Sequence, residues 1–239
     1  MRIDIWSDVV CPWCFIGKRR LESALADFEH ADQVEIVYRS FELDPSAPRE
    51  GHQPTVEALT AKYGPGAPQM MQQVAQVAAE EGLAFRLEET VHTNTVDAHR
   101  VLHLALAEGG PALQARLKEG YLSAYFEQAR NIGDPAVLRE VAAAAGLDPA
   151  RVEEVLAGEE FGDAVAADVA QARQLGASGV PFFVVDQRYA ISGAQPVEVF
   201  ERALRQAWQD AHPTLTTLDV AEGDDVVCGP DGCAVPEPR

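Results

Sequence analysis

The stretch that decides the fold lies near the start of the chain and reads Ser7-Asp8-Val9-Val10-Cys11-Pro12-Trp13-Cys14-Phe15-Ile16-Gly17-Lys18. Residues 2–6, just before it, alternate in polarity and predict a β-strand. The apolar residues at its end and beyond recur at helical spacing: Phe15, Leu21, Leu25 and Phe28. They predict a helix that continues to about Glu29. Cys11 and Cys14 are therefore expected where a strand turns into a helix.

This location favours redox chemistry at the two cysteines. The first turn of a helix carries unpaired N–H groups and a partial positive charge, which stabilise a thiolate. We therefore expect the pKa of Cys11 to be lowered. Cys14 lies about one turn further on the same helix face, where a disulfide can close, and Pro12 suits the first helical turn. We expect an exposed reactive thiol, Cys11, a partly covered partner, Cys14, and an oxidising disulfide between them.

The composition is that of an ordinary soluble globular protein. The 239 residues are 47% hydrophobic and 24% charged, enough for one sizeable domain or a small domain with a large insertion. The formal net charge of -19 argues against nucleic acid and anionic membrane as partners, because both repel an acidic surface. No segment reaches the roughly 18 apolar residues of a membrane span.

The four cysteines occur as two closely spaced pairs. Met1 and Arg2 run directly into the first predicted strand, so we expect no signal peptide and a cytoplasmic location. Disulfides in the cytoplasm are mostly transient, catalytic or redox-sensing. The pairs are therefore interpreted as reactive or metal-binding rather than as a framework for folding.

The rest of the chain predicts two halves of a sheet separated by helices. Residues 34–41 predict a second strand, parallel to the first, and residues 42–54 a loop. Helical patterns then cover 55–63, 69–81, 96–108, 112–130, 135–145, 149–157 and 160–175. Strands return at 181–185 and 189–192 around a short turn, and a last amphipathic helix follows at 196–208.

The segment around the first cysteine pair, residues 7–20, resembles the active site of the thioredoxin superfamily and looks like its DsbA branch. Within that branch it is most similar to the FrnE-type oxidoreductases, which are relatives of 2-hydroxychromene-2-carboxylate isomerases and kappa-class glutathione transferases. The resemblance implies an α/β, thioredoxin-like fold with a large all-helical insertion. The thioredoxin-like domain is then expected at 1–53 and 177–209, the insertion at 54–176, and an acidic tail at 210–239.

The same resemblance assigns a role to Val180 and Pro181, which precede the third strand. Thioredoxin-like proteins hold a cis-proline here beside the cysteine pair, so Pro181 is expected to be cis and part of the catalytic site. The backbone of Val180 would then face the cysteines and pair with an extended client peptide as an added strand. Trp13, between the cysteines, is a candidate apolar contact for clients, with simple packing beside the turn as the alternative.

His99 and His103 are spaced by four residues on a predicted helix, a spacing that can bind a metal. No third ligand is evident, so we favour core or interface histidines and predict no metal here. The run from Asn94 to Arg100 resembles a segment near the substrate cleft of the related isomerases, which makes Asn94 and His99 candidate substrate contacts. Lys18 is interpreted as part of a solvated helix face. The alternative is that its positive charge adds to the field near the Cys14 thiolate.

The second pair, Cys228 and Cys233, flanks the strong turn sequence Gly-Pro-Asp-Gly. A tight turn can bring the two sulfurs within bonding range. Three interpretations stay open. The pair is a local structural disulfide, or a redox-active auxiliary pair that exchanges with Cys11 and Cys14, or part of a zinc site made by all four thiolates. We favour the auxiliary redox pair, which some FrnE-type proteins carry.

These observations lead to a cytoplasmic thiol-disulfide oxidoreductase, with disulfide isomerase activity as a further possibility. It would need no cofactor and would act on disulfide-containing client proteins or small thiols. The first alternative is a glutathione-dependent isomerase or transferase of the kappa type, although those relatives typically hold a serine at the position of Cys11. The second is a zinc-stabilised, non-catalytic module that binds clients on its helices.

Overall fold

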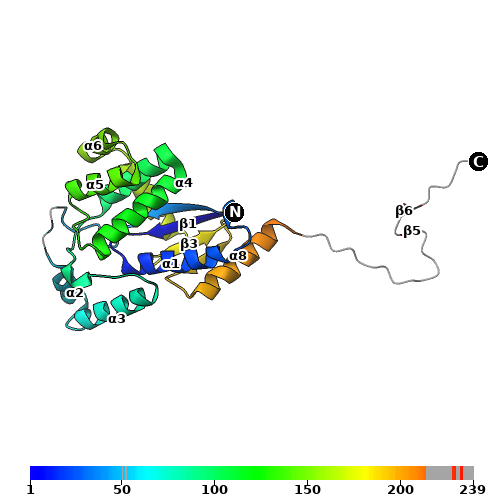
Figure 1. Ribbon diagram of the computed structural model, residues 1–239, viewed down its shortest axis with the longest axis horizontal. Helices are drawn as coiled ribbons and strands as arrows, with labels where there is room; N and C mark the ends of the chain where they lie inside the picture. Colours follow the sequence, from blue (N-terminus) through cyan, green and yellow to red (C-terminus); the bar gives the residue numbers. More distant parts are fainter. Residues whose placement is uncertain (50, 52, 214–227, 230–231, 234–239) are drawn as a thin grey trace, which may run out of the picture.

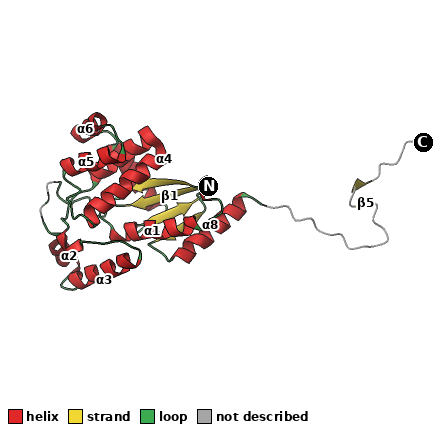
Figure 2. Ribbon diagram, in the orientation of Figure 1, coloured by secondary structure: helices red, strands yellow, loops and turns green. Residues whose placement is uncertain are grey.

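The computed structural model describes residues 1–49, 51, 53–213, 228–229 and 232–233. A single four-stranded sheet lies between two helical layers (Figure 1). Helices α1 (Pro12–Ala26) and α8 (Val197–Ala211) pack together on one face, and α7 (Gly162–Gln174) lies on the other. Helix α4 (Val96–Phe126) runs along the edge strand β2 (Glu35–Ser40), where Gln114 bonds both the N–H and the carbonyl of Tyr38. Figure 2 shows how far helices, drawn in red, dominate over strands.

The sheet has the order β2-β1-β3-β4. Strand β1 (Arg2–Ser7) runs parallel to β2 and antiparallel to β3 (Phe182–Val185), and β3 pairs antiparallel with β4 (Tyr189–Ser192). The predicted β-α-β half and the predicted hairpin therefore meet in one mixed sheet, with β1 between β2 and β3. Since β1 leads directly into the cysteines, the centre of the sheet positions them.

Side chains of β1 alternate between two cores, as the period of a strand requires. Ile3 and Ile5 are buried with Leu21 of α1 and Phe200 of α8. Trp6 points to the other side, packs among residues near α7 and donates a hydrogen bond from its indole Nε1 to the carbonyl of Asp168 at 2.9 Å. This burial on both faces fixes the register of the strand that carries the cysteines.

The remaining helices follow the sequence signals closely. They are α2 (Thr55–Tyr63), α3 (Ala67–Glu80), α5 (Pro135–Ala145) and α6 (Pro149–Ala157), with short 3-10 turns at Ala31–Gln33 and Leu87–Glu89. Asp134 and Asp148 are the N-caps of α5 and α6. The side chains of Asp134 and Asp148 accept hydrogen bonds from the N–H groups of Ala136 and Ala150 at 2.8 and 3.0 Å.

Some predicted boundaries were wrong. The helix after the cysteines ends at Ala26 rather than near residue 29, and α7 begins at Gly162 rather than at 160. The two helices predicted at 96–108 and 112–130 are present as the two arms of α4, which breaks between them at Gly110, where φ is 67°, but the second arm ends at Phe126 rather than at 130. Only a residue without Cβ adopts this backbone easily, and Pro111 then starts the second arm.

The boundaries of the helical insertion, 54–176, stay a prediction, although α2 to α7 do lie between β2 and β3 along the chain. In the acidic tail, β5 (Cys228–Gly229) pairs antiparallel with β6 (Gly232–Cys233), so Cys228 is the register partner of Cys233. Residues 230 and 231, which lie between the two strands in the sequence, are outside the described residues. In the part of the chain that is described, no helix has the length and apolar character needed to cross a bilayer.

Helix α1 approaches the loop before β3 very closely at Gly17. A Cβ atom at Gly17 would lie 3.0 Å from Cγ of Pro181, 3.2 Å from Cζ of Phe183 and 3.4 Å from Cβ of Ala194. Glycine therefore lets the helix of the cysteines pack directly against Pro181.

We predict that Gly17→Ala lowers the free energy of unfolding by about 1 kcal/mol, because overpacking of roughly 1–3 kcal/mol exceeds the roughly 1 kcal/mol gain in helix propensity. Urea unfolding would measure the change. The matched control is Gly162→Ala in α7, where an added Cβ meets nothing within 4 Å. This control should equal the wild type in stability or exceed it. Equal losses in both variants would contradict the account of the Gly17 contact.

Candidate active site

Cys11 and Cys14 lie at the junction that the sequence predicted. Cys11 is the N-cap of α1, Pro12 is the first helical residue, and the N–H of Cys14 donates to the carbonyl of Cys11 at 3.0 Å. Both cysteines are free thiols. The first turn of α1 therefore directs its unpaired N–H groups toward the end that carries Cys11.

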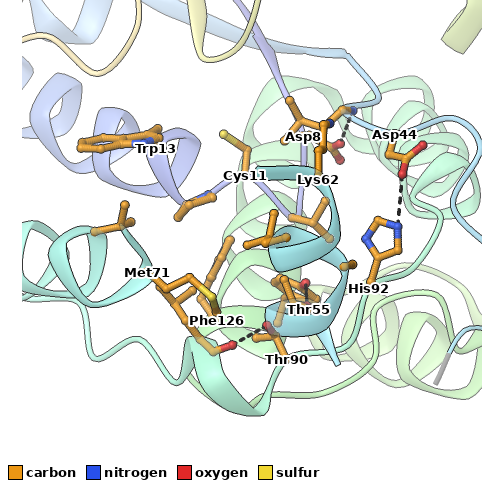
Figure 3. A pocket seen from close by; sticks show the side chains of 18 of the residues that line it. Asp8, Cys11, Trp13, Asp44, Thr55, Lys62, Met71, Thr90, His92 and Phe126 are labelled. Carbon is orange, nitrogen blue, oxygen red and sulfur yellow. Dashed lines mark hydrogen bonds and ion pairs between the residues drawn. The ribbon is translucent and has the colours of Figure 1, made fainter. Parts of the chain in front are cut away.

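The expectation of an exposed Cys11 was wrong, because both cysteines are only 3% exposed. Cys11 instead forms part of the wall of a cavity, with Trp13 on one side and Asp8 on the other (Figure 3). Residues of α2 and α3 form the facing walls, and this cover was not predictable from the local sequence around the cysteines. Trp13 is 37% exposed and marks the open side.

The cavity has a volume of about 760 Å³ and is mostly apolar. Leu59 of α2, Met71 and Val74 of α3, and Phe126 at the end of α4 line it. Several polar side chains also line it, and two pairs of them contact each other (Figure 3). His92 Nε2 lies 3.1 Å from Asp44 Oδ2, and Thr55 Oγ1 lies 3.0 Å from the hydroxyl of Tyr125. The sequence analysis missed all of these residues, because only the folding of α2 and α3 over the cysteines brings them to the site.

The peptide bond between Val180 and Pro181 is cis, as predicted. The thiol of Cys11 donates a hydrogen bond to the carbonyl of Val180, with Sγ 3.5 Å from the oxygen. Val180 and Gly179 also line the cavity. The site therefore combines the start of α1 with the loop before β3, two segments about 170 residues apart in the sequence.

A buried carboxylate, Asp8, lies beneath this junction. Its Oδ1 accepts a hydrogen bond from the N–H of Val9 at 2.7 Å and faces Nε2 of His99 at 3.2 Å. Its Oδ2 accepts from the N–H of Leu43 at 2.8 Å. Burial alone would raise the pKa of Asp8, but the hydrogen bond and charge of His99, with help from Leu43 and Lys118, lower it below its usual value. Asp8 is therefore held as a carboxylate.

Cys14 lies in a different electrostatic environment. Burial raises its pKa well above the usual value, and the neighbouring Cys11 raises it further, whereas the charge of Lys118 opposes both effects. Lys118, on α4, is 1% exposed, and burial lowers its pKa to about 8 against the opposing effects of Cys14 and Asp8. A buried cation thus lies near the dithiol pair, and no motif in the sequence pointed to it.

The structure separates the predicted substrate contacts into two groups. Trp13 and Val180 line the cavity, but Asn94 and His99 do not. Asn94 donates from Nδ2 to the carbonyl of Pro45 at 3.2 Å and accepts from the N–H of Val96 at 2.9 Å, so it shapes a loop. His99 is 1% exposed behind Asp8. These two residues are therefore supports of the site rather than parts of its surface.

Two other predictions on charged residues can be compared with the structure. His103 lies in the core, as the sequence analysis favoured. Its Nε2 is 3.1 Å from Ser40 Oγ and 3.1 Å from Asp168 Oδ2. The solvated helix face expected at Lys18 was wrong. Lys18 is only 6% exposed and its ammonium pairs with Glu22 and Glu119, since α4 packs over this part of α1. Among the side chains that the structure describes, no three His, Cys, Asp or Glu residues form a group suited to a metal ion.

Comparisons with known proteins agree with this geometry. The model of the DSBA-like thioredoxin domain family matches residues 2–205. The crystal structure of a probable DsbA oxidoreductase from Streptomyces coelicolor is 47% identical, covers 99% of this chain and 100% of that one, and superposes with a TM-score of 0.82. An uncharacterised Bacillus subtilis protein, YwbO, is 28% identical over 209 residues, 85% of this chain and 96% of that protein.

A more distant match concerns the fold alone. A 2-hydroxychromene-2-carboxylate isomerase is 15% identical, with a TM-score of 0.64 over 88% of this chain and 98% of that one. Together the matches confirm the predicted fold class, a DsbA-like thioredoxin fold that is largely helical. The narrower assignment to the FrnE type stays a prediction.

The Asp8 network leads to a pH-dependent prediction. Asp8→Asn should cost on the order of 3 kcal/mol of folding free energy at pH 7, because it removes a buried carboxylate that accepts two backbone hydrogen bonds and faces His99. Since the pKa of Asp8 is lowered in the folded state from 3.8, its contribution is present above that value and is lost as the pH falls through the folded pKa. The difference between wild type and variant should therefore shrink at pH 3, as measured by urea unfolding.

The control is Asp148→Asn, at the exposed N-cap of α6, because asparagine caps helices as well as aspartate does. It should change stability little at either pH. A cost of Asp8→Asn that is equal at pH 7 and pH 3 would show that Asp8 is not held ionised.

Proposed function

Since the chain belongs to the DSBA-like thioredoxin domain family, we propose that it catalyses thiol-disulfide exchange through Cys11 and Cys14. One observation carries the proposal. Cys11 caps the first turn of α1, one helical turn before Cys14, and its sulfur faces the carbonyl of Val180 and an open cavity. A thiol in this position has both a field that favours the thiolate and a route for a partner to reach it.

The reaction we propose has two exchange steps. The thiolate of Cys11 attacks one sulfur of a client disulfide, and the other client sulfur leaves with the bonding electron pair. The thiolate of Cys14 then attacks Cys11, forms the Cys11–Cys14 disulfide and releases the second client thiolate. Two electrons pass from the enzyme to the client, each leaving thiolate takes up a proton, and the reverse sequence oxidises a client dithiol.

Two features support the capture of a disulfide in an extended segment of a client. The carbonyl of Val180 lies at Cys11, and no group in the described part of the chain accepts a hydrogen bond from the Val180 N–H, so this backbone can pair with an added strand. The apolar cavity next to it can take an apolar side chain beside the client's cysteine. Protein disulfides are therefore the proposed substrates.

The finer parts of the proposal are isomerase activity and the cytoplasmic location. An isomerase must attack a wrong disulfide and release it again, and Cys11, at the start of α1 beside an open cavity, is placed for that attack. Two closely spaced cysteine pairs are compatible with the cytoplasm, where the disulfides that do form are mostly transient, catalytic or redox-sensing. Fractionation of cells that produce the protein would test the location.

The cavity also favours a second candidate, exchange with a small thiol or its mixed disulfide. Its volume of about 760 Å³ lies within the range of small-molecule sites, roughly 300–1,000 Å³. This candidate is related to the kappa-type activity considered from the sequence, but Cys11 would remain the attacking sulfur. Comparison of rates with a protein disulfide and with a glutathione mixed disulfide would rank the two substrates.

Substitution of each cysteine should have a different effect. Cys11→Ser should reduce the rate of disulfide reduction in a model protein such as insulin to the uncatalysed level, because the attacking sulfur is lost. Cys14→Ser should retain the first attack and accumulate a mixed disulfide between Cys11 and the client, detectable by mass spectrometry of the intact protein. Retained turnover in Cys11→Ser would refute the proposed function.

For the second cysteine pair we propose an auxiliary redox couple that exchanges with Cys11 and Cys14. Cys228 and Cys233 are register partners of an antiparallel pair. The Cα atoms of such partners lie about 4.5–5.5 Å apart, within the range that a disulfide spans. A disulfide there would close a very short loop, which stabilises a fold only slightly and thus favours a redox role.

The double variant Cys228→Ser/Cys233→Ser should slow multiple turnover while leaving the first attack by Cys11 unchanged, because only the transfer between the pairs is removed. Steady-state and single-turnover rates would separate these steps. Equal steady-state rates in variant and wild type would refute the auxiliary role. Stoichiometric zinc in the purified protein, lost on substitution of any cysteine, would refute the redox role of both pairs.

A further inference from the structure

The cavity that Cys11 lines also contains a histidine held by a carboxylate. His92 lies just before α4, and Asp44 lies in the loop after β2. Nε2 of His92 is 3.1 Å from Oδ2 of Asp44, and both side chains form part of the cavity wall (Figure 3). Neither residue belongs to the motifs that predicted the redox site, and the exchange steps described above use neither of them.

Asp44 is a carboxylate that its own loop holds in place. Oδ1 accepts hydrogen bonds from the N–H of Ser46 at 3.0 Å and from the Ser46 hydroxyl at 2.5 Å. The bond from the hydroxyl is the main cause that holds the pKa of Asp44 below its usual value, and burial opposes it. Oδ2 is left to accept from the Nε2–H of His92. This contact assigns the tautomer, so Nδ1 of the neutral ring carries a lone pair.

The second ring nitrogen of His92 faces the cavity. Figure 3 shows Nδ1 on the side of the ring away from Asp44 and toward the cavity, and it forms no hydrogen bond with any described residue. The side chain of His92 is 25% exposed, so a bound molecule can reach this nitrogen. The other charged side chains of the described cavity wall are Lys62 of α2, whose charge also acts on Asp44, and Asp8 beside Cys11.

Thiol-disulfide exchange in this cavity produces a sulfur that needs a proton. Cys11 attacks along the axis of the client disulfide, whose bond is about 2 Å long, so the leaving sulfur lies about 4 Å beyond Cys11, within the cavity. An ordinary cysteine thiol has a pKa of about 8.5, and apolar walls disfavour the thiolate further. Imidazole is the side chain that gives and takes protons near neutral pH, and one bound client can contact both His92 and Cys11 because they line the same cavity.

We propose that His92, oriented by Asp44, is the acid-base residue for the sulfur that the client releases. The proposal rests on the dithiol exchange proposed above and adds a group that acts on the client rather than on Cys14. In this role His92 distinguishes between clients, since it speeds the release of basic alkyl thiols and has little effect on thiols that leave without a proton.

The proton and the electrons balance in both directions. In reduction, the Cys11 thiolate forms a bond to one client sulfur, the bond between the two client sulfurs breaks, and the leaving sulfur takes the electron pair and the proton from Nδ1 of the imidazolium. The neutral ring then takes up a proton from water. In oxidation, neutral Nδ1 takes the proton of the second client thiol. That sulfur attacks the client sulfur of the mixed disulfide and releases the Cys11 thiolate.

Two disulfides with different leaving groups test the proposal. 5,5′-Dithiobis(2-nitrobenzoate) releases an aryl thiolate that is stable at neutral pH without a proton, whereas 2-hydroxyethyl disulfide releases an alkyl thiolate that needs one. In Cys14→Ser, which stops at the mixed disulfide, the added change His92→Gln should slow attack on the alkyl disulfide about a hundredfold at pH 7, the lower end of the usual contribution of a positioned acid. The rate with the aryl disulfide should change less than about twofold.

The pH profile is a second readout that a structural role would not move. Attack on the alkyl disulfide needs the Cys11 thiolate and the imidazolium together, so its rate should pass through a maximum and fall at high pH. His92→Gln should lose the alkaline fall. Asp44→Asn removes the charge that stabilises the imidazolium, so it should move the alkaline fall to lower pH.

The matched control is His30→Gln, because His30 stacks on Trp208 and lines a different pocket. It should leave both rates and the pH profile unchanged. Equal slowing with both disulfides in His92→Gln, or an unchanged rate with the alkyl disulfide, would overturn the proposal. No reaction of Cys11 with either disulfide in the wild type would instead overturn the proposed function itself.

A leaving-group series on the unaltered protein covers the case in which His92→Gln does not fold. Small symmetrical disulfides are compared whose thiols range from acidic aryl thiols to basic alkyl thiols. The rate of the first attack by Cys11 should depend only weakly on the acidity of the leaving thiol, because His92 supplies the proton to the basic ones. In uncatalysed exchange the more acidic thiol leaves faster. An equally steep dependence in the protein would overturn the proposal.

Discussion

The architecture of the site depends on the buried carboxylate of Asp8. Its two oxygens bind the backbone of Val9 at the end of β1, the backbone of Leu43 in the loop after β2, and His99 on α4. Three segments that are remote in the sequence are thereby held together three residues before Cys11. A buried charge is tolerated only with such a set of partners. The sheet and the helical layer consequently meet at a defined place, and that place is the floor of the cavity next to the reactive sulfur.

The helical layer changes what the dithiol can do. At a bare strand-helix junction Cys11 would face water, but here α2 and α3 enclose it in an apolar cavity. Reduced access to water strengthens electrostatic interactions, so the carboxylate of Asp8 and the ammonium of Lys118 act on the sulfurs with greater effect than on a surface. The enclosed site and the buried charges belong together, because both arise from the packing of α2, α3 and α4 over the end of β1.

Local signals in the sequence were sufficient for the elements and for the central motif. Alternation in residues 2–6, the cysteines at a helix start, and the Val180-Pro181 sequence before a strand all predicted features that the structure contains. The burial of Cys11 was not predictable, because it is imposed by helices more than 40 residues away. For the same reason the sequence did not predict that His99 pairs with Asp8 or that Lys118 lies near the cysteines. Helical periodicity shows that a face is buried, but it does not show which distant side chain that face meets.

The break in α4 at Gly110 gives one helix two separate approaches to the site. Its first arm carries His99 to Asp8, and its second arm brings Lys118 to Ser7, the adjacent residue. In an unbroken helix these two positions, 19 residues apart, would be separated by about 28 Å, too far for both side chains to reach neighbouring residues. The break at Gly110 also sets how far the second arm of α4 is rotated about its own axis relative to the first arm. A single residue gained or lost there would turn the second arm by roughly 100°, since a helix has about 3.6 residues per turn, and would swing the ammonium away while the imidazole stayed in place. Insertions or deletions at Gly110 would thus separate the side chains of His99 and Lys118 without altering either arm of α4.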